Sequence, residues 1–317
     1  MKLLALLLGL FVTTASAQDY PNRPIRVIVP YAAGGLPDTM ARLVGAKMSE
    51  SLGQQMVVEN RGGAGGIVGT TEVVKAAPDG YTVLVADVGQ IAINPHLFAK
   101  LPYDPLKDLV GVSLMGTSAL YLVAHPSVPA NNLAELIALV RSQPGKLSYG
   151  SSGTGSIHHL ATEALKVGLG LDIVHVPYKG AGQSVPALLG GQVALLYAAL
   201  PTVEGHYKSG KVKILAVSTP QRSAQTPEVP TVAEAALPGY DFVAEIGLYA
   251  PAGTPPDVVM RLATQAARAV KHPDVVQRFK QLGIDPVGST PEALAAQNRV
   301  NYEKYARVVK ASGAKID

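Results

Sequence analysis

Short apolar runs, each followed by a glycine-rich turn and then by a helical pattern, recur along this chain. In the first, Val27–Val29 places three apolar residues in succession, which is typical of a strand buried on both faces. Gly34 and Gly35 follow, and apolar positions then recur at helical spacing after Asp38. We therefore predict a strand, a tight turn and a helix, with the Asp38 carboxylate as the helix N-cap.

This first turn is a candidate anion site. Glycines let a backbone approach a ligand closely, and a helix N-terminus presents free N–H groups at the positive end of its dipole. The alternative is a plain tight turn in which Asp38 serves only as a cap.

The same succession continues through the rest of the chain, with predicted helices at 67–76, 133–141, 157–165, 256–270, 273–282 and 291–309. Further strands are predicted at Met56–Asn60, Tyr81–Ala86, Leu147–Tyr149, Ile173–Tyr178 and Val193–Tyr197. This alternation predicts an α/β fold with doubly wound sheets, whose ligands bind beyond the carboxyl ends of the strands.

The chain divides into two predicted domains. Leu120–Ala124 and Val212–Ser218 look like crossings between them, because a second set of strand and helix units lies between these two runs. We expect a first domain from residues 18–120 plus 220–317 and a second from 121–219. The ligand cleft then lies between the domains, which close on it by hinging.

Residues 1–17 have the pattern of a secretory signal peptide. A positive start is followed by the apolar core Leu3–Val12 and by the small-residue segment Ala15–Ala17. The core is too short for a permanent membrane span, although an N-terminal anchor is the alternative. We expect cleavage after Ala17 and a mature protein outside the cytoplasm.

Composition removes several classes of function. The chain has no cysteine and no tryptophan, and its formal net charge of +4 comes from scattered rather than clustered cations. Disulfides, thiolate metal sites and nucleic-acid binding therefore have no support. The seven histidines show no metal-binding spacing, and no dinucleotide or phosphate-binding motif is present. We expect neither a metal nor a cofactor.

The loop Ser151–Ser156, ahead of a predicted helix, is a second candidate anion site. Its serine, threonine and glycine residues supply O–H and N–H donors that suit a carboxylate without any arginine. A flexible, solvated loop is the alternative. His159, in the following helix, is either a donor facing the cleft or, like His158, a residue of the helix surface.

Several segments together make the chain recognisable: Val29–Asp38, Asn60–Gly66, Pro78–Thr82, Tyr149–Ser156, Val176–Gly180 and Ala250–Pro255. In this order they resemble the Bug family, the periplasmic substrate-binding components of tripartite tricarboxylate transporters. The resemblance covers essentially the whole mature chain. It implies a two-domain Venus-flytrap fold, no catalysis, and capture of a small carboxylate for delivery to membrane permease subunits. We expect a monomer.

The resemblance also implies which residues meet the ligand. In that family the turn matching Ala33–Gly35 grips one carboxylate, and the loop matching Ser152–Ser156 takes the far end together with the segment matching Tyr178–Gly180. Asp38 is expected to order the turn rather than touch an anion. The implied ligand contacts are Tyr31, Ala33, Gly34, Gly35, Ser152, Gly153, Thr154, Ser156 and Lys179.

Four further candidates are Asp87, Gln90, Ala198 and Glu245. Asp87 and Gln90 follow the third strand at the ligand edge, whereas Ala198 and Glu245 depart from residues common in the family. A surface or interdomain role is the alternative for Asp87 and Glu245. If either carboxylate faces the cleft, a polyanion is disfavoured and a ligand with an amine or ring nitrogen gains a partner.

Two functions of other classes stay open. The protein could act on a membrane sensor, because sensing and transport use the same closure equilibrium. It could also be an extracytoplasmic serine hydrolase that pairs Ser152 with His159, although no third orienting group is evident.

Overall fold

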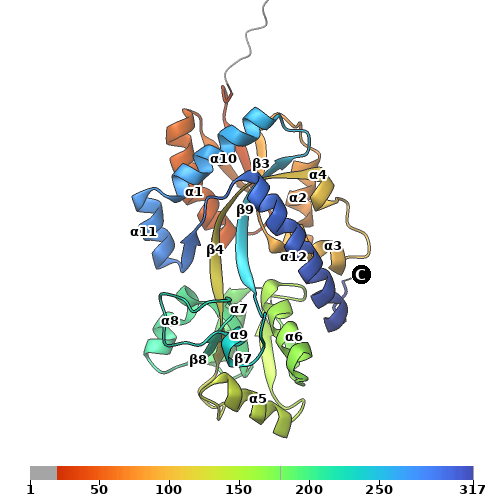
Figure 1. The fold of residues 1–317 in the computed structure, drawn as a ribbon, viewed down its shortest axis with the longest axis vertical. Coiled ribbons are helices and arrows are strands. Elements are labelled where there is room, and N and C mark those ends of the chain that lie inside the picture. Colours follow the sequence, from red (N-terminus) through yellow and green to blue (C-terminus); the bar gives the residue numbers. More distant parts are fainter. Residues whose placement is uncertain (1–19, 179, 317) are drawn as a thin grey trace, which may run out of the picture.

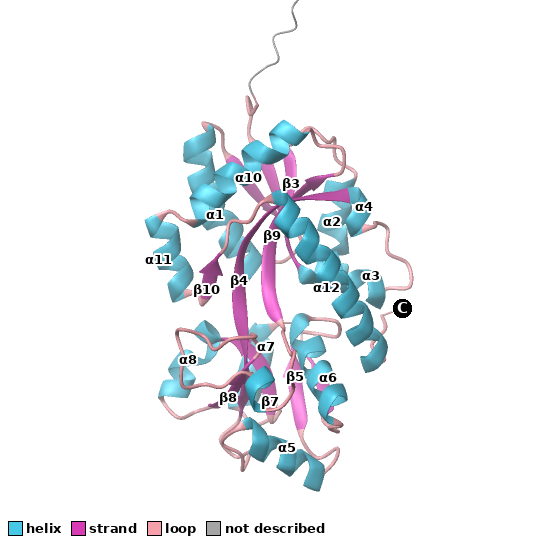
Figure 2. Ribbon diagram, in the orientation of Figure 1, coloured by secondary structure: helices cyan, strands magenta, loops and turns pink. Residues whose placement is uncertain are grey.

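The computed structural model describes residues 20–178 and 180–316, which form two lobes joined by long strands (Figure 1). The predicted signal peptide and Lys179 lie outside the described residues. Helices cover strands in both lobes (Figure 2), so the α/β class predicted from the sequence is confirmed. Within residues 20–178 and 180–316, no helix is long and apolar enough to cross a membrane.

The first lobe is built on a parallel sheet with β1 in the middle. Val27 of β1 lies opposite Val58 on one side and Val83 on the other. The strands are β1 (Ile25–Val29), β2 (Met56–Asn60), β3 (Thr82–Asp87) and β10 (Ile284–Pro286). The helices are α1 (Leu36–Leu52), η1 (Ala64–Gly66), α2 (Ile67–Val74), η2 (Gly89–Ile93), α3 (Asn94–Leu97), α4 (Pro105–Asp108), α10 (Pro256–Val270), α11 (Pro273–Gln281) and α12 (Pro291–Ser312).

Helix α10 illustrates how the first lobe buries its core. Val258, Leu262, Ala266 and Ala269 recur at intervals of three or four residues and are all buried against the sheet and α1. Complete burial of a valine or leucine side chain contributes about 1.5–3 kcal/mol. The helical spacing read from the sequence therefore fixes which face of α10 meets the sheet.

Two long strands carry the chain between the lobes: β4 (Leu109–Ala124) and β9 (Val243–Pro251). Residues 109–119 of β4 pair antiparallel with β9, and residues 120–124 pair with β7 and β8 of the second lobe. The strands of both lobes thus belong to one continuous ten-stranded sheet. Figure 1 shows β4 and β9 running side by side from one lobe toward the other.

The second lobe repeats the parallel arrangement around β5, which pairs with β6 and β7. Its strands are β5 (Ser148–Ser151), β6 (Val174–Pro177), β7 (Leu195–Ala199) and β8 (Lys213–Val217). Its helices are α5 (Leu133–Ser142), α6 (Ile157–Leu169), α7 (Ala181–Leu189), α8 (Leu200–Lys208) and α9 (Val232–Ala235).

One of the two predicted crossings is wrong. The apolar run Val212–Ser218 contains β8, which stays in the second lobe beside β4, and the chain returns only through β9. A buried strand inside a lobe and a crossing strand have the same apolar pattern, so the sequence could not separate them. The other run, Leu120–Ala124, is the end of a crossing strand that begins at Leu109.

Ser218 ties three segments together where the lobes meet. Its hydroxyl accepts a hydrogen bond from Leu120 N (3.1 Å) and donates to Phe242 O. Its backbone N–H donates to Leu120 O, and Phe242 N donates to Ser218 O. Ser218 is fully buried, so these groups have no access to water.

A hydrophobic cluster also joins the lobes. It contains Leu97 of the first lobe, Leu160 of α6, and Tyr305 of α12, whose lower half lies beside α6 (Figure 1). Tyr240 and Phe242 belong to the same cluster. We therefore propose that the second lobe extends to about residue 242, beyond the boundary at 219 expected from the sequence, and that both lobes share α12.

Replacing Ser218 by alanine tests the junction. The change leaves Leu120 N and Phe242 O without their buried partner, so we expect the free energy of unfolding to fall by about 1–3 kcal/mol. Urea denaturation followed by circular dichroism measures it. Ser209→Ala, which removes a hydrogen bond of an exposed serine in the turn after α8, is the control and should change stability by under about 0.5 kcal/mol. Equal losses in both variants would contradict this account.

Candidate functional site

A cavity of about 690 Å³ lies between the lobes. The first lobe contributes residues that follow β1, β2 and β3, and the second lobe contributes the loop after β5 and the start of α6. The carboxyl ends of parallel strands thus meet at one site, as the alternating pattern predicts. The lining residues are Tyr31, Ala64, Gly65, Asp87, Gly89, Gln90, Asn94, Leu97, Phe98, Ser152, Thr154, Gly155, Ser156, Ile157, His158, Gly180 and Ile316.

Tyr31 is held at the cavity wall by a hydrogen-bond network. Its hydroxyl donates to Asp87 Oδ1 (2.8 Å) and accepts from Gln90 Nε2 (2.8 Å). Gln90 Nε2 also donates to Gly65 O, and Gln90 Oε1 accepts from Asp87 N. Burial raises the pKa of Tyr31 well above its ordinary value, so the phenol is neutral and its proton points at Asp87.

Asp87 is half-buried at the end of β3, just before the π-helical turn η2. Besides the Tyr31 hydroxyl, its Oδ1 accepts Gly89 N (2.7 Å). Burial raises the pKa of this carboxyl above its ordinary value, although the two hydrogen bonds oppose that shift. Single π turns frequently occur at functional sites, and here the turn brings Asp87 and Gln90 to the same wall.

The glycine run after β2 forms another part of the wall. Ala64, Gly65 and Gly66 have φ of 47°, 64° and 88°, so three successive residues are left-handed. A side chain at Gly66 would overlap the Gln90 amide, which explains the glycine there. Gly66 N donates to Gly63 O, which leaves the N–H groups of Ala64 and Gly65 as the candidates for contacting an anion at this wall.

The loop after β5 supplies the second-lobe wall. Ser156 caps α6, since its hydroxyl accepts His159 N (3.3 Å), and the positive end of the helix dipole points at the cavity. Gly155 has φ of 80°, and a Cβ there would overlap the Leu97 side chain of the first lobe. The two lobes are therefore in close contact beside the cavity.

His159 and His175 hold the loop after β5 in place. His159 Nδ1 accepts a hydrogen bond from Gly155 N (3.1 Å), and its ring stacks on His175 with centroids 4.1 Å apart. His175 Nε2 lies 2.7 Å from Ser151 Oγ, which in turn accepts Gly153 N. Because His159 Nδ1 accepts, it must be unprotonated. The loop geometry thus depends on neutral histidines.

The structure reverses the roles expected of the two adjacent histidines. His159 is buried and faces the interior of the second lobe, so the expectation that it faces the cleft is wrong. His158 lines the cavity instead, and its Nδ1 is buried without a partner among the described residues. Burial lowers the pKa of His158 to about 4, so it is neutral near pH 7. Ser152 and His159 form no catalytic pair.

Two other candidates lie away from the cavity. Ala198 is buried within β7, opposite Tyr121 of β4, and packs in the second-lobe core. Glu245 of β9 faces α12, where its carboxylate accepts Gln297 Nε2 (3.0 Å) and Asn301 Nδ2 (2.8 Å). Burial raises its pKa, and these amides oppose that shift. Neither residue lines this cavity, because Ala198 packs into the second-lobe core and Glu245 bonds to α12.

The turn after β1 is exposed, and the described cavity walls do not include Ala33, Gly34, Gly35 or Gly153. The helix begins at Leu36 with Gly35 as its N-cap, so the expected capping position of Asp38 is wrong.

Asp38 nevertheless orders the turn. Its carboxylate accepts Gly34 N (2.9 Å), Asn60 Nδ2 (3.0 Å) and Arg42 Nε (3.0 Å). Burial alone would raise its pKa, but these hydrogen bonds outweigh burial and lower it. Asn60 Nδ2 also donates to Tyr31 O, which links the turn to the cavity wall.

Several lining residues were missed by sequence reasoning, namely Ala64, Gly65, Gly89, Asn94, Leu97, Phe98, Ile157, His158 and Ile316. The glycine run after β2 was the available signal for the first two. Leu97, Phe98 and Ile316 are apolar residues on short or terminal segments, for which no sequence pattern indicates a cavity.

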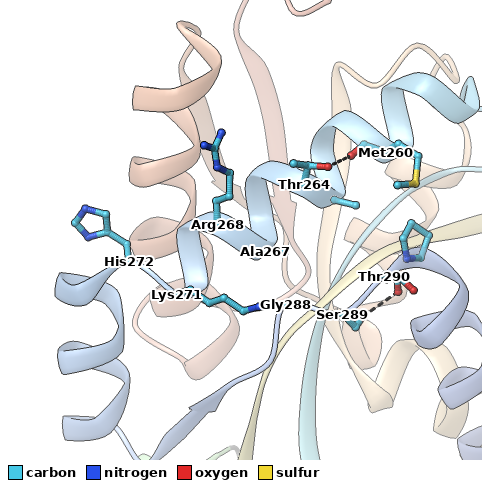
Figure 3. A pocket seen from close by; sticks show the side chains of 11 residues that line it. Met260, Thr264, Ala267, Arg268, Lys271, His272, Gly288, Ser289 and Thr290 are labelled. Atoms are coloured by element: carbon cyan, nitrogen blue, oxygen red, sulfur yellow. Dashed lines mark hydrogen bonds between the residues drawn. The ribbon is translucent and has the colours of Figure 1, made fainter.

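A second cavity, of about 650 Å³, lies on the first lobe away from the interlobe cavity, between α10 and residues 288–291 (Figure 3). Figure 3 shows Arg268, Lys271 and His272 pointing in different directions. Polar groups that converge on one point are what define a ligand site, so this groove is not a candidate. Within residues 20–178 and 180–316, no group of histidine and acidic side chains is arranged to hold a metal ion.

The two lobes, the shared crossing strands and the enclosed cavity define the class of periplasmic solute-binding proteins. Residues 40–313 match the family described as "Tripartite tricarboxylate transporter family receptor" (TctC), and the chain belongs to this family. The resemblance to Bug proteins is confirmed. Members of this class are solute-binding proteins rather than enzymes.

Individual relatives agree with this assignment. The chain is 38% identical to Protein BugT of Bordetella pertussis strain Tohama I, over 100% of this chain and 99% of BugT. The structure of R. palustris Rpa4515 with adipate has a TM-score of 0.85 and 33% identity, covering 94% of this chain and 100% of that one. MatC from Rhodopseudomonas palustris, with bound malate, has a TM-score of 0.80 and 35% identity, covering 92% and 100%.

Acid should weaken the second lobe. Burial, and then the neighbouring His159, lower the pKa of His175 to about 4, whereas an unfolded histidine titrates near 6.5. Between about pH 4 and pH 6.5 the unfolded chain therefore binds more protons at this histidine than the folded chain does. The stabilisation from neutral His175 is complete above about pH 6.5 and is lost as the pH falls toward 4. We expect the melting temperature to fall over this range, and less steeply in His175→Gln. His272→Gln, at a half-exposed histidine of the first lobe, is the matched control. A His175→Gln slope equal to that of the control would contradict the prediction.

Proposed function

We propose that the protein is an extracytoplasmic receptor that captures a small carboxylate between its lobes and delivers it to the membrane permease subunits of a tripartite tricarboxylate transporter. The observation that carries this proposal is the cavity itself, whose two walls are rich in neutral hydrogen-bond donors. The relatives solved with adipate and malate support a carboxylate as the ligand class.

The proposed contacts come from both lobes. On the first-lobe side they are the backbone N–H groups of Ala64 and Gly65, beside the Tyr31 and Gln90 side chains, whose own polar hydrogens are donated within the wall. On the second-lobe side they are Ser152, Thr154, Ser156 and the N-terminus of α6. Lys179, next to Gly180 of the wall, and the turn at Ala33–Gly35 remain proposed contacts that complete the site when the lobes close.

The remaining steps are part of the same proposal. Residues 1–17 direct the chain through the membrane, cleavage follows Ala17, and the mature protein works as a monomer in the periplasm. Closure on the ligand presents the joined lobes to the permease. A sensor would read the same closed form, and retention of the liganded protein by permease-containing vesicles, but not by vesicles without permease, separates the two roles.

A thermal-shift panel of mono-, di- and tricarboxylates, aromatic acids and amino acids tests ligand capture. A ligand at 100 times its Kd adds about 2.7 kcal/mol to stability, which raises Tm by roughly 5–10 °C in a domain of this size. The protein is first unfolded and refolded to remove carried ligand. A selective shift is the expected result, and no shift with any carboxylate would reject the proposal.

Gly155→Ala tests where the ligand binds. The added methyl overlaps Leu97 at the edge of the cavity, so we expect at least a tenfold loss of affinity for whichever carboxylate gives the largest shift. Gly170→Ala is the matched control. Gly170 is the C-cap of α6, the helix that begins just after Gly155, and its φ is 62°. An alanine there would have open space around its Cβ, so it carries comparable backbone strain without the overlap. Calorimetric titration measures both, and equal affinities would place the ligand elsewhere.

A further inference from the structure

The two oxygens of the Asp87 carboxylate have different surroundings. Oδ1 accepts hydrogen bonds from the Tyr31 hydroxyl and from Gly89 N. No hydrogen bond from residues 20–178 or 180–316 reaches Oδ2, and Oδ2 is not among the buried unpaired atoms of the described chain. Since Asp87 lines the cavity, its unshared oxygen is open to a ligand.

The direction of the Tyr31 proton shows that Asp87 accepts hydrogen bonds within this network and donates none to it. Gln90 Nε2 donates to Gly65 O and Gln90 Oε1 accepts Asp87 N, so the orientation of the amide is set by partners that can act in only one way. The same Nε2 donates to the Tyr31 hydroxyl, whose own proton must then point at Asp87 Oδ1. Two donors converging on Oδ1 stabilise an ionised carboxylate.

No cation among the described residues compensates this charge. The ionisable groups near Asp87 are the phenols of Tyr31, Tyr103, Tyr249 and Tyr305, and burial raises the pKa of each, so all are neutral near pH 7. The described lining residues include no lysine or arginine, and His158 is neutral. An ionised carboxylate at a partly dry wall is costly unless a cation meets it.

The opposite wall has the complementary character. Ser152, Thr154 and Ser156 offer hydroxyls beside the N-terminus of α6, which favours a negative group. A ligand with a cationic nitrogen at one end and a carboxylate at the other would therefore bridge the first lobe to the second. A dicarboxylate in the same position would set one of its anions against Asp87.

Resting on the proposed function, we propose that Asp87 is the specificity-determining residue of the cavity and that it selects small zwitterions, carboxylates that also carry an amine or a protonated ring nitrogen. The nitrogen donates to Asp87 Oδ2, and the carboxylate lies against the Ser152–Ser156 loop. The chemical class is thus an aminocarboxylate rather than a di- or tricarboxylate.

Matched ligand pairs test this on the unmodified protein. 6-Aminohexanoate and adipate, or 4-aminobutyrate and succinate, have similar lengths and differ mainly in an ammonium group replacing a carboxylate. Calorimetric titration at pH 7.5 should give at least tenfold tighter binding for the aminocarboxylate in one pair or both. Tighter binding of the dicarboxylates would overturn this inference and leave carboxylate capture standing, whereas no binding of either series would remove both.

Asp87→Asn then tests the residue. We expect at least a tenfold loss of aminocarboxylate affinity and a smaller loss, or a gain, for the paired dicarboxylate. Glu245→Gln is the matched control, because it removes an equal charge from a carboxyl that burial also affects but that faces α12 outside this cavity. An unchanged preference in Asp87→Asn would overturn the assignment. So would an increase in affinity for aminocarboxylates, which would indicate that Asp87 is a protonated donor. The ligand pairs test the inference even if this variant does not fold.

Discussion

The antiparallel pairing of β4 with strands of both lobes is the interaction on which the rest of the structure depends. Residues 109–119 pair with β9 in one lobe, and residues 120–124 pair with β7 and β8 in the other. Because β4 pairs with strands of both lobes along its whole length, although the register shifts at a few points, the lobes are positioned relative to each other by the sheet. Ser218, buried at the junction, adds side-chain hydrogen bonds to the same joint. The cavity exists because the strand ends of both lobes are held facing each other.

The cavity combines two kinds of wall. Left-handed residues Ala64 and Gly65 and the N-terminus of α6 place backbone groups at the cavity, and chain geometry sets their positions. Asp87 adds one acidic group, and the network through Tyr31 and Gln90 holds it in place. Fixed backbone donors suit a carboxylate in general, whereas a single side chain is what can separate one ligand class from another. Generic and selective recognition thus come from different parts of the site.

The sequence predicted the architecture well and the site in part. The apolar run Val27–Val29 and the helical spacing in α10 identified buried elements directly, because buried positions are apolar and recur with the period of the helix or strand. Tyr31, Asp87 and Ser152 were placed at the site because strand ends converge in such folds. The choice of His159 over His158 was wrong, since neighbouring helix positions diverge by about 100° and the sequence gives no absolute orientation. Glu245 was placed in the cleft for a similar reason, because alternation along a strand shows which residues share a face but not which face meets the ligand.

Ile316 has a consequence for how the molecule is made. This residue follows α12, its backbone N–H donates to Leu97 O, and its side chain completes the cavity wall. Every other lining residue precedes Ile316 in the chain. The cavity wall is therefore complete only once the segment after α12 has docked on Leu97. A tag fused close behind Ile316 would crowd the wall, so a spacer is needed between Ile316 and any C-terminal tag.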